Sequence, residues 1–196
     1  HFDVVKLLLD KGAAIDQART DDGTTPLYIA CYEGHFDVVK LLLDKGAAID
    51  QARTDTGTTP LFIACVNGRF DVVKLLLDRG AAIDQAKTNT GSTPLYIACQ
   101  KGHFDVVKLL LDKGAAIDQA TTDIGAAPLY VACQNGHFDV AKLLLTKGAA
   151  IDQAADNGMT PLYMACHKGH FEVVKLLLAN GADSSWSVAD STSVLG

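Results

Sequence analysis

The chain has 196 residues, of which 48% are hydrophobic and 20% charged, a composition typical of a soluble folded protein rather than a disordered or fibrous one. Its formal net charge of −6 and its lack of a basic run argue against a nucleic-acid partner, because phosphate binding requires clustered Lys and Arg. The apolar runs, such as residues 38–43, are far shorter than the roughly 20 residues of a membrane-spanning helix, so we expect no membrane partner either.

The first complete predicted element is a short helix that begins at Pro26 and ends at Gly34. Thr25 is a good N-cap residue, and proline suits the first helical position because the N–H that it lacks would have no helical partner there. A second helix is expected to begin near Phe36. It carries apolar residues at 38, 39 and 41–43, and Gly46 supplies the left-handed position at its end.

The segment from Ala47 to Gly57 is rich in turn-forming residues and has little helical periodicity, so we expect an extended loop with a tight turn, here called a finger. This whole unit recurs along the chain, with successive prolines separated by 34, 34, 34 and 33 residues. The prolines that mark this period are Pro26, Pro60, Pro94, Pro128 and Pro161.

A period of this length predicts a stacked array in which no single unit buries its own apolar face. Each predicted helix has only two to three turns, too few to persist alone in water, so packing between neighbouring units must hold it. We divide the chain into a partial repeat (1–19), five stacked repeats (20–183) and a degenerate finger or C-terminal cap (184–196) that contains Trp186. Residue 1 already falls in repeat sequence, and no targeting segment is visible at this terminus.

The unit GTTPLYIACYEGHFDVVKLLLDKGA, residues 23–47, resembles the ankyrin repeat, which opens on a T-P-L-H-x-A pattern. The tryptophan and Leu-Gly signature of tetratricopeptide repeats is absent. The resemblance covers nearly the whole chain and implies an all-α, ankyrin-type solenoid of helix-turn-helix repeats with protruding finger loops. It also implies a concave groove that binds another protein.

Two features depart from the family pattern. Most fingers are one residue longer than the finger from Gly148 to Gly158, which has the usual length, so they are expected to bend differently. An aromatic residue also replaces the histidine of the motif. We expect these rings to pack inside the array, the alternative being a partly exposed aromatic stripe for a ligand. They are Tyr28, Phe62, Tyr96, Tyr130 and Tyr163.

The cysteines occupy one equivalent position in every repeat. Adjacent helices pack about 8–10 Å apart, beyond the roughly 7 Å Cα separation that a disulfide tolerates, so no disulfide ladder is expected. They are interpreted as small core thiols of a protein in the cytoplasm or another reducing compartment, with a redox or metal role as the alternative. The five are Cys31, Cys65, Cys99, Cys133 and Cys166.

No catalytic, cofactor or metal site is expected. One histidine per repeat is too widely spaced for a shared zinc ion, and no phosphate-binding loop or lone nucleophile with a distinct base is present. The repeated acid at Asp37 and lysine at Lys40 are interpreted as an intrahelical pair that keeps the surface soluble. The chain is therefore predicted not to be an enzyme.

Function is sought where the repeats differ, because residues identical in all units are expected to satisfy the stack. This hypothesis includes two further sets of variable positions. One is the finger positions 121 and 155, and the other is the equivalent positions in each repeat that include Thr24 and Ala126. We expect a groove with mixed charge near Arg53 and a more apolar end near Met159. The predicted partner-binding residues are Tyr32, Glu33, Arg53, Thr56, Val66, Asn67, Lys87, Thr90, Gln100, Lys101, Ile124, Gln134, Asn135, Met159, His167 and Lys168.

Several alternatives remain open at this stage: variable but merely solvated surface, a docking segment of a larger enzyme, and a scaffold with no natural partner. A fourth is a substrate for Asp or Asn hydroxylation, since Asp50, Asp84, Asp118 and Asp152 lie near a finger position that is hydroxylated in some ankyrin-like proteins. Exposed apolar faces at the ends of the array would also favour end-to-end self-association.

Overall fold

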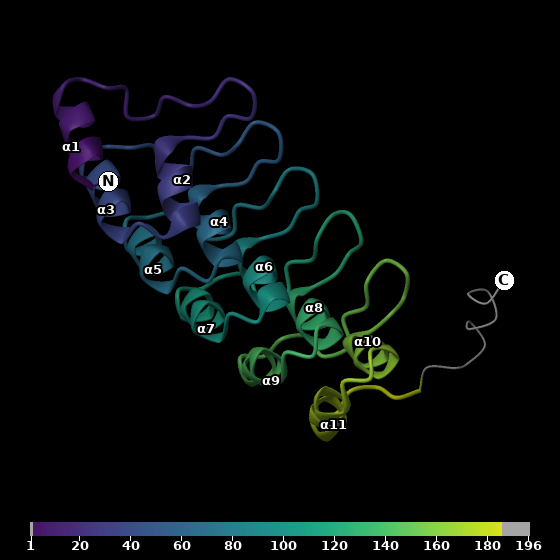
Figure 1. The fold of residues 1–196 in the computed structure, drawn as a ribbon. Helices are drawn as coiled ribbons and strands as arrows, with labels where there is room; N and C mark the ends of the chain where they lie inside the picture. Colours follow the sequence, from purple (N-terminus) through teal and green to yellow (C-terminus); the bar gives the residue numbers. More distant parts are fainter. Residues whose placement is uncertain (1, 186–196) are drawn as a thin grey trace.

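The computed structural model describes residues 2–185, which form eleven α-helices and no β-strand (Figure 1). The shorter helices that follow each finger, here called first helices, are α2 (Pro26–Glu33), α4 (Pro60–Val66), α6 (Pro94–Lys101), α8 (Pro128–Gln134) and α10 (Pro161–His167). The second helices are α1 (Phe2–Asp10), α3 (Phe36–Asp44), α5 (Phe70–Asp78), α7 (Phe104–Asp112), α9 (Phe138–Thr146) and α11 (Phe171–Ala179).

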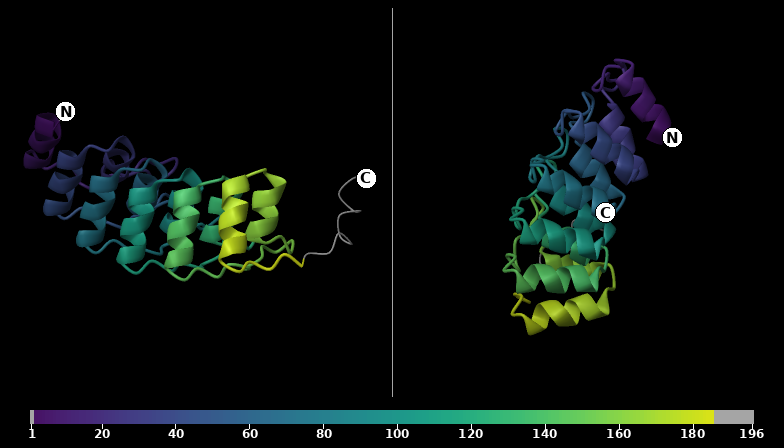
Figure 2. Two further views of the ribbon diagram at one scale, coloured as in Figure 1. Left: turned by 90° about the horizontal axis from the view of Figure 1, so that it is seen from below. Right: turned by 90° about the vertical axis from the view of Figure 1, so that its left-hand side faces the viewer.

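The two sets of helices form two adjacent rows, and the fingers project from the array on the side of the first helices (Figure 1). Each first helix contacts the next one along the array, and each second helix does the same, as in α4·α6 and α5·α7. The side view shows an elongated stack of nearly parallel helices (Figure 2). This is the predicted helical solenoid with protruding loops.

Local capping follows the repeated sequence. The Thr25 hydroxyl accepts a hydrogen bond from the backbone N–H of Tyr28 at 3.1 Å, which satisfies one orphan donor of the first turn. Gly34 ends the same helix with φ of 81°, a left-handed conformation that a side chain would strain. In α8 the capping residue is Ala127, which offers no side-chain acceptor.

The core runs without interruption through the stack. Its most deeply buried side chains are one leucine from each first helix and one from each second helix of the five complete pairs. Burial of each contributes about 1.5–3 kcal/mol. These leucines are Leu27, Leu42, Leu61, Leu76, Leu95, Leu110, Leu129, Leu144, Leu162 and Leu177.

Adjacent fingers are joined by backbone hydrogen bonds. The N–H of Thr54 donates to the Asp22 carbonyl at 3.0 Å, and Thr88 donates to Thr56 at 3.1 Å in the same way. The finger with the usual length closes differently, as expected, because its Ala155 N–H donates to the Met159 carbonyl only four residues ahead. In the longer fingers the closing bond spans five residues, as from Arg53 to Thr58.

The expected pairing of Asp37 with Lys40 is wrong for most helices. Among residues 2–185 this intrahelical ion pair forms only in α11, between Glu172 and Lys175 (3.3 Å). Ion pairs instead join the C-terminal ends of consecutive second helices, at 2.7–3.3 Å. These pairs, here called the ion-pair ladder, are Asp10–Lys45, Asp44–Arg79, Asp78–Lys113 and Asp112–Lys147.

No helix in the described part of the chain is long and apolar enough to cross a membrane. The proposed cap around Trp186 lies outside the described residues.

Candidate partner-binding surface

The predicted site residues fall in two rows on the side of the first helices, which together we call the finger-side face. One row consists of the C-terminal ends of the first helices and the other of the fingers, with Thr56, Thr90 and Ile124 at the tips and Arg53, Lys87 and Met159 at the bases. At the helix ends, Tyr32 is 46% exposed, and Glu33, Lys101, Asn135, His167 and Lys168 are exposed as well. Val66, Asn67, Gln100 and Gln134 are half-buried.

At most of these positions the array uses the backbone carbonyl. Asn67 is an exception, because its side-chain Nδ2–H donates to the Tyr32 carbonyl of the preceding repeat at 3.3 Å. The Nε2–H of His103 donates to the Val66 carbonyl at 3.0 Å, and His137 reaches the Gln100 carbonyl in the same way. Arg69 occupies the position where the other repeats have a histidine, and it still donates through Nε to the Tyr32 carbonyl at 3.4 Å. The side chain of the accepting residue is therefore free to vary without loss of this contact.

The finger tips also contribute backbone carbonyls to the stack. Thr56, Thr90 and Ile124 each supply a backbone carbonyl to the next finger. Their side chains point outside the core: Ile124 is 48% exposed and the two threonines are half-buried. Sequence comparison between repeats found these residues, but it could not show that their backbones hold the stack.

Other variable positions were wrongly expected to face a partner. Thr121 and Ala155 are only 5% and 6% exposed, and Ala126 is fully buried. These residues lie at the base of a finger, where backbone bonds such as Thr121 N–H to Ala126 O close the loop against the neighbouring repeat. The equivalent Thr24, Thr58 and Ser92 are buried too. The side chains that are buried at these sites are all small, whereas the larger Arg53, Lys87 and Met159 at equivalent positions are half-buried.

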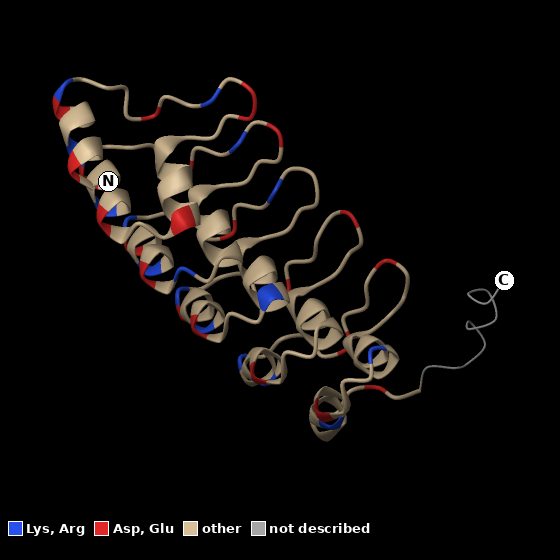
Figure 3. Cartoon of the chain, viewed as in Figure 1, with Lys and Arg blue, Asp and Glu red and all other residues tan. Residues whose placement is uncertain are grey.

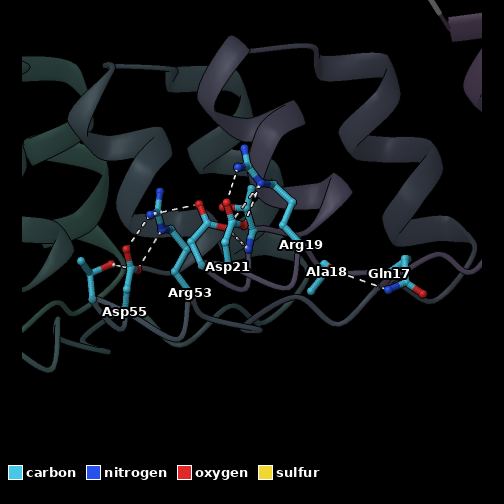
Figure 4. Close-up of polar contacts among 9 residues, drawn as sticks. Gln17, Ala18, Arg19, Asp21, Arg53 and Asp55 are labelled. Carbon is cyan, nitrogen blue, oxygen red and sulfur yellow. Dashed lines mark hydrogen bonds and ion pairs between the residues drawn. The ribbon is translucent and has the colours of Figure 1, made fainter.

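Arg53 is exposed only in part and is already engaged. Its Nη2 lies 2.6 Å from Asp55 (Figure 4) and 3.2 Å from Asp22 of the preceding finger. Its guanidinium lies 5.7 Å from the centre of the Tyr28 ring. The preceding Arg19 pairs with Asp21 in the same cluster. A partner that used Arg53 would have to compete with these contacts.

Charge changes along the row of fingers (Figure 3). The first three fingers carry Arg19, Arg53 and Lys87, whereas the tips of the last two carry only acids, Asp123 and Asp156. Lys87 lies over the Phe62 ring, 5.8 Å from its centre. The expected mixed-charge end is thus present, but the opposite end combines Ile124 with acidic residues and is less apolar than predicted, because Thr121 and Ala155 are buried.

The aromatic residues of the motif pack inside the array, as expected. Tyr28, Phe62, Tyr96 and Tyr130 are at most 6% exposed, and burial raises the pKa of Tyr96 to about 12. Tyr163 of the last pair is half-buried and stacks on His167 at a centroid distance of 6.1 Å.

Four of the five cysteines are buried thiols, and burial raises the pKa of Cys31 and Cys133 to about 12. The prediction fails for Cys166, which is exposed. In earlier repeats the following first helix packs beside this position, and no further helix follows α11 in the described chain. Within residues 2–185 no three His, Cys, Asp or Glu side chains are grouped so that they could hold a metal ion.

The aspartates considered for hydroxylation have a structural contact. The Asp84 carboxylate accepts a hydrogen bond from the N–H of Ala116 in the next repeat at 3.0 Å. Asp50, Asp118 and Asp152 do the same, and so does Asp16, whose role the sequence analysis did not identify. These side chains tie consecutive repeats together.

A family model described as ankyrin repeats (3 copies) matches residues 1–55, 48–121 and 118–185. The chain belongs to the ankyrin repeat family. Ankyrin repeats are generally protein–protein interaction modules, and proteins built from them are typically non-enzymatic. No curated protein matches the chain at a significant level.

Proposed function

We propose that this ankyrin repeat chain binds another protein through its finger-side face. One observation supports this best: the stack takes the backbone carbonyls of residues such as Gln100 and Ile124 and leaves their side chains available. The side chains of Asn67, Asn135, Thr56 and Thr90 are less available, because each forms a hydrogen bond within the array. Exposed side chains that differ from repeat to repeat can recognise a non-repetitive partner.

The proposal includes all sixteen residues predicted from the sequence, with Arg53 the least available because of its ion pairs. Tyr32 is the strongest candidate anchor, since it is a large and exposed aromatic residue, a type enriched at interaction hot spots. The unpaired cysteines support a reducing compartment such as the cytoplasm, where thiols persist.

Affinity capture with a matched control tests this function. The variant Tyr32→Ala/Gln100→Ala/Gln134→Ala should keep the thermal stability of the wild type and lose the proteins that the wild type enriches. The control variant Lys6→Ala/Lys11→Ala/Lys175→Ala changes exposed residues in or just after the terminal second helices, away from the finger-side face, and should retain them. Equal loss in both variants, or unfolding of the first, would contradict the assignment of this face.

A second mode, end-to-end self-association, is favoured by one observation. Val4 and Leu8 of α1 are 58% and 54% exposed, whereas their counterparts in α5, Val72 and Leu76, are at most 2% exposed. An apolar surface of this kind can support contact between copies. If so, Leu8→Glu should abolish any concentration-dependent growth in mass measured by sedimentation.

A further inference from the structure

The second helices present a surface that the repeat comparison treated as part of the stack. Each of the six begins with phenylalanine and an acid, followed by lysine and leucine at the fifth and sixth positions. In α5 these are Phe70, Asp71, Lys74 and Leu75. The phenylalanine, acid and lysine are exposed in every one of these helices, although their identities hardly vary. We call this surface the second-helix face.

The phenylalanine row is unusually accessible for its residue type. The six rings are 36–65% exposed, and they repeat once per helix along the array. Core packing does not account for an invariant and exposed aromatic residue, which would be expected inside. The members of this row are Phe2, Phe36, Phe70, Phe104, Phe138 and Phe171.

Except in α11, where Glu172 pairs with Lys175, the charged residues beside these rings form no ion pair within residues 2–185. The ion-pair ladder uses acids and bases at the other end of each second helix, such as Asp78 and Lys113. Asp71 and Lys74 form no ion pair with each other or with another described residue. Each helix therefore displays one negative and one positive group, three residues apart, on the same exposed face.

The charge pattern of one such helix is complementary to that of a second, antiparallel copy of the same helix. When two such helices lie antiparallel with their acid–lysine segments in register, Asp71 of one copy faces Lys74 of the other, and the reverse contact forms by symmetry. The same register places Phe70 opposite Leu75.

We propose that the second-helix face binds a second copy of this chain, through a two-fold axis that runs along the array and pairs each central second helix with its own counterpart. A ring about 40% exposed offers roughly 80 Å² of its surface. Three paired helices then bury about 250 Å² of aromatic surface per copy, well below the roughly 800 Å² of a stable partner. An interface of this size belongs to the weak and transient class, so the dimer is expected to be reversible.

Charge reversal followed by mixing tests this dimer. The acid-reversed variant is Asp71→Lys/Asp105→Lys, and the lysine-reversed variant is Lys74→Glu/Lys108→Glu. Each alone places like charges opposite one another, so its dissociation constant should rise at least about tenfold relative to the wild type. An equimolar mixture should dimerise again, because every lysine then faces an acid.

Sedimentation equilibrium from about 10 μM to about 1 mM covers the range in which so small an interface dissociates. All variants carry Leu8→Glu, which removes end-to-end contact through α1, and the expected result on this background is a monomer–dimer equilibrium with no larger species. A finger-side control, Lys101→Glu/Lys168→Glu, should leave this equilibrium unchanged. A strictly monomeric protein, failure of the mixture to dimerise, open-ended growth, or sensitivity to the finger-side control would overturn the proposal.

Discussion

Single residues in this chain often serve the array through one atom while the rest of the side chain remains unconstrained. Gln100 contributes its carbonyl to His137, and Ile124 contributes its carbonyl to Asp156 of the next finger. Asp84 is the opposite case, since its carboxylate is the group that bonds to Ala116. This difference explains why residue identity is constant at some exposed sites and variable at others.

Removal of the Asp84 carboxylate should weaken the contact between two repeats. We expect Asp84→Ala to lower the free energy of unfolding by about 1 kcal/mol, the usual net value of one hydrogen bond. Asp84→Asn keeps an oxygen that can accept the same bond and should lose less. Urea denaturation of both variants measures the difference, and equal losses would show that the hydrogen bond is not the cause.

The cysteines should differ sharply in reactivity. Cys31 and Cys133 are buried, and at neutral pH a thiol with a pKa of about 12 forms almost no thiolate, the reactive species. Cys166 is exposed. We expect one thiol to react rapidly with Ellman's reagent in the native protein and all five cysteines to react after unfolding. Rapid native reaction of several thiols would contradict the burial seen here.

At the scale of the element, each short helix combines a cap, a buried stripe and bonds to its neighbours. The sequence predicted these helices well, because Thr-Pro starts and Gly ends are local signals that depend on few residues. It did not predict the ion-pair ladder, since Asp78 and Lys113 lie 35 positions apart and only stacking brings them together.

The missing cap of α8 offers a test of helix initiation. Ala127→Thr should raise the free energy of unfolding by about 1 kcal/mol, because the new hydroxyl can accept from the Tyr130 N–H. Thr59 and Thr93 occupy the equivalent position without any exposed surface, so the site accommodates threonine. The matched variant Thr93→Ala should lose a similar amount in thermal or urea unfolding. No gain from Ala127→Thr would indicate strain at this site.

The ion-pair ladder should make stability depend on acid pH. A hydrogen bond from Lys113 holds the pKa of Asp78 below its usual range, and Lys147 acts in the same way on Asp112. A lowered pKa in the folded state stabilises the protein above the ordinary aspartate pKa of about 3.9, and this contribution is lost as the pH falls through the lowered value.

The variant Lys113→Met/Lys147→Met should consequently be less stable than the wild type at neutral pH, and the difference should disappear as the pH falls through the lowered pKa of these carboxyl groups. Urea denaturation at a series of pH values measures this convergence. Added salt should reduce the difference at neutral pH, because the pairs are exposed. A difference that persists unchanged at low pH would point to lost packing of the lysine stems instead.

The whole molecule is a one-dimensional stack in which each repeat is stabilised by contacts with its neighbours. The central helices α4, α6 and α8 contact a first helix on each side as well as their own second helix, whereas α1 packs only on α3. In such arrays, stability is approximately a sum of unit and interface terms. The ends should therefore open more readily than the middle.

Hydrogen exchange should show this gradient. We expect amides of α6 to exchange most slowly and those of α1 and α11 most rapidly, although α1 and α7 have the same sequence, FDVVKLLLD. Mass spectrometry of peptic fragments can compare these helices directly. Equal protection of α1 and α7 would mean that local sequence, and not stacking, sets the stability.

The sequence by itself determined the repeat, the helices, their caps and the apolar stripes, because each of these depends on neighbours within one unit. Only the tertiary structure decided which variable side chains are buried at the finger bases, such as Ala155, and which remain exposed, such as Ile124. It also decided that the second-helix phenylalanines face outward. The physical reason is that the exposure of a side chain depends on contacts between repeats. Near-identical repeat sequences do not show which surface of each repeat packs against its neighbours.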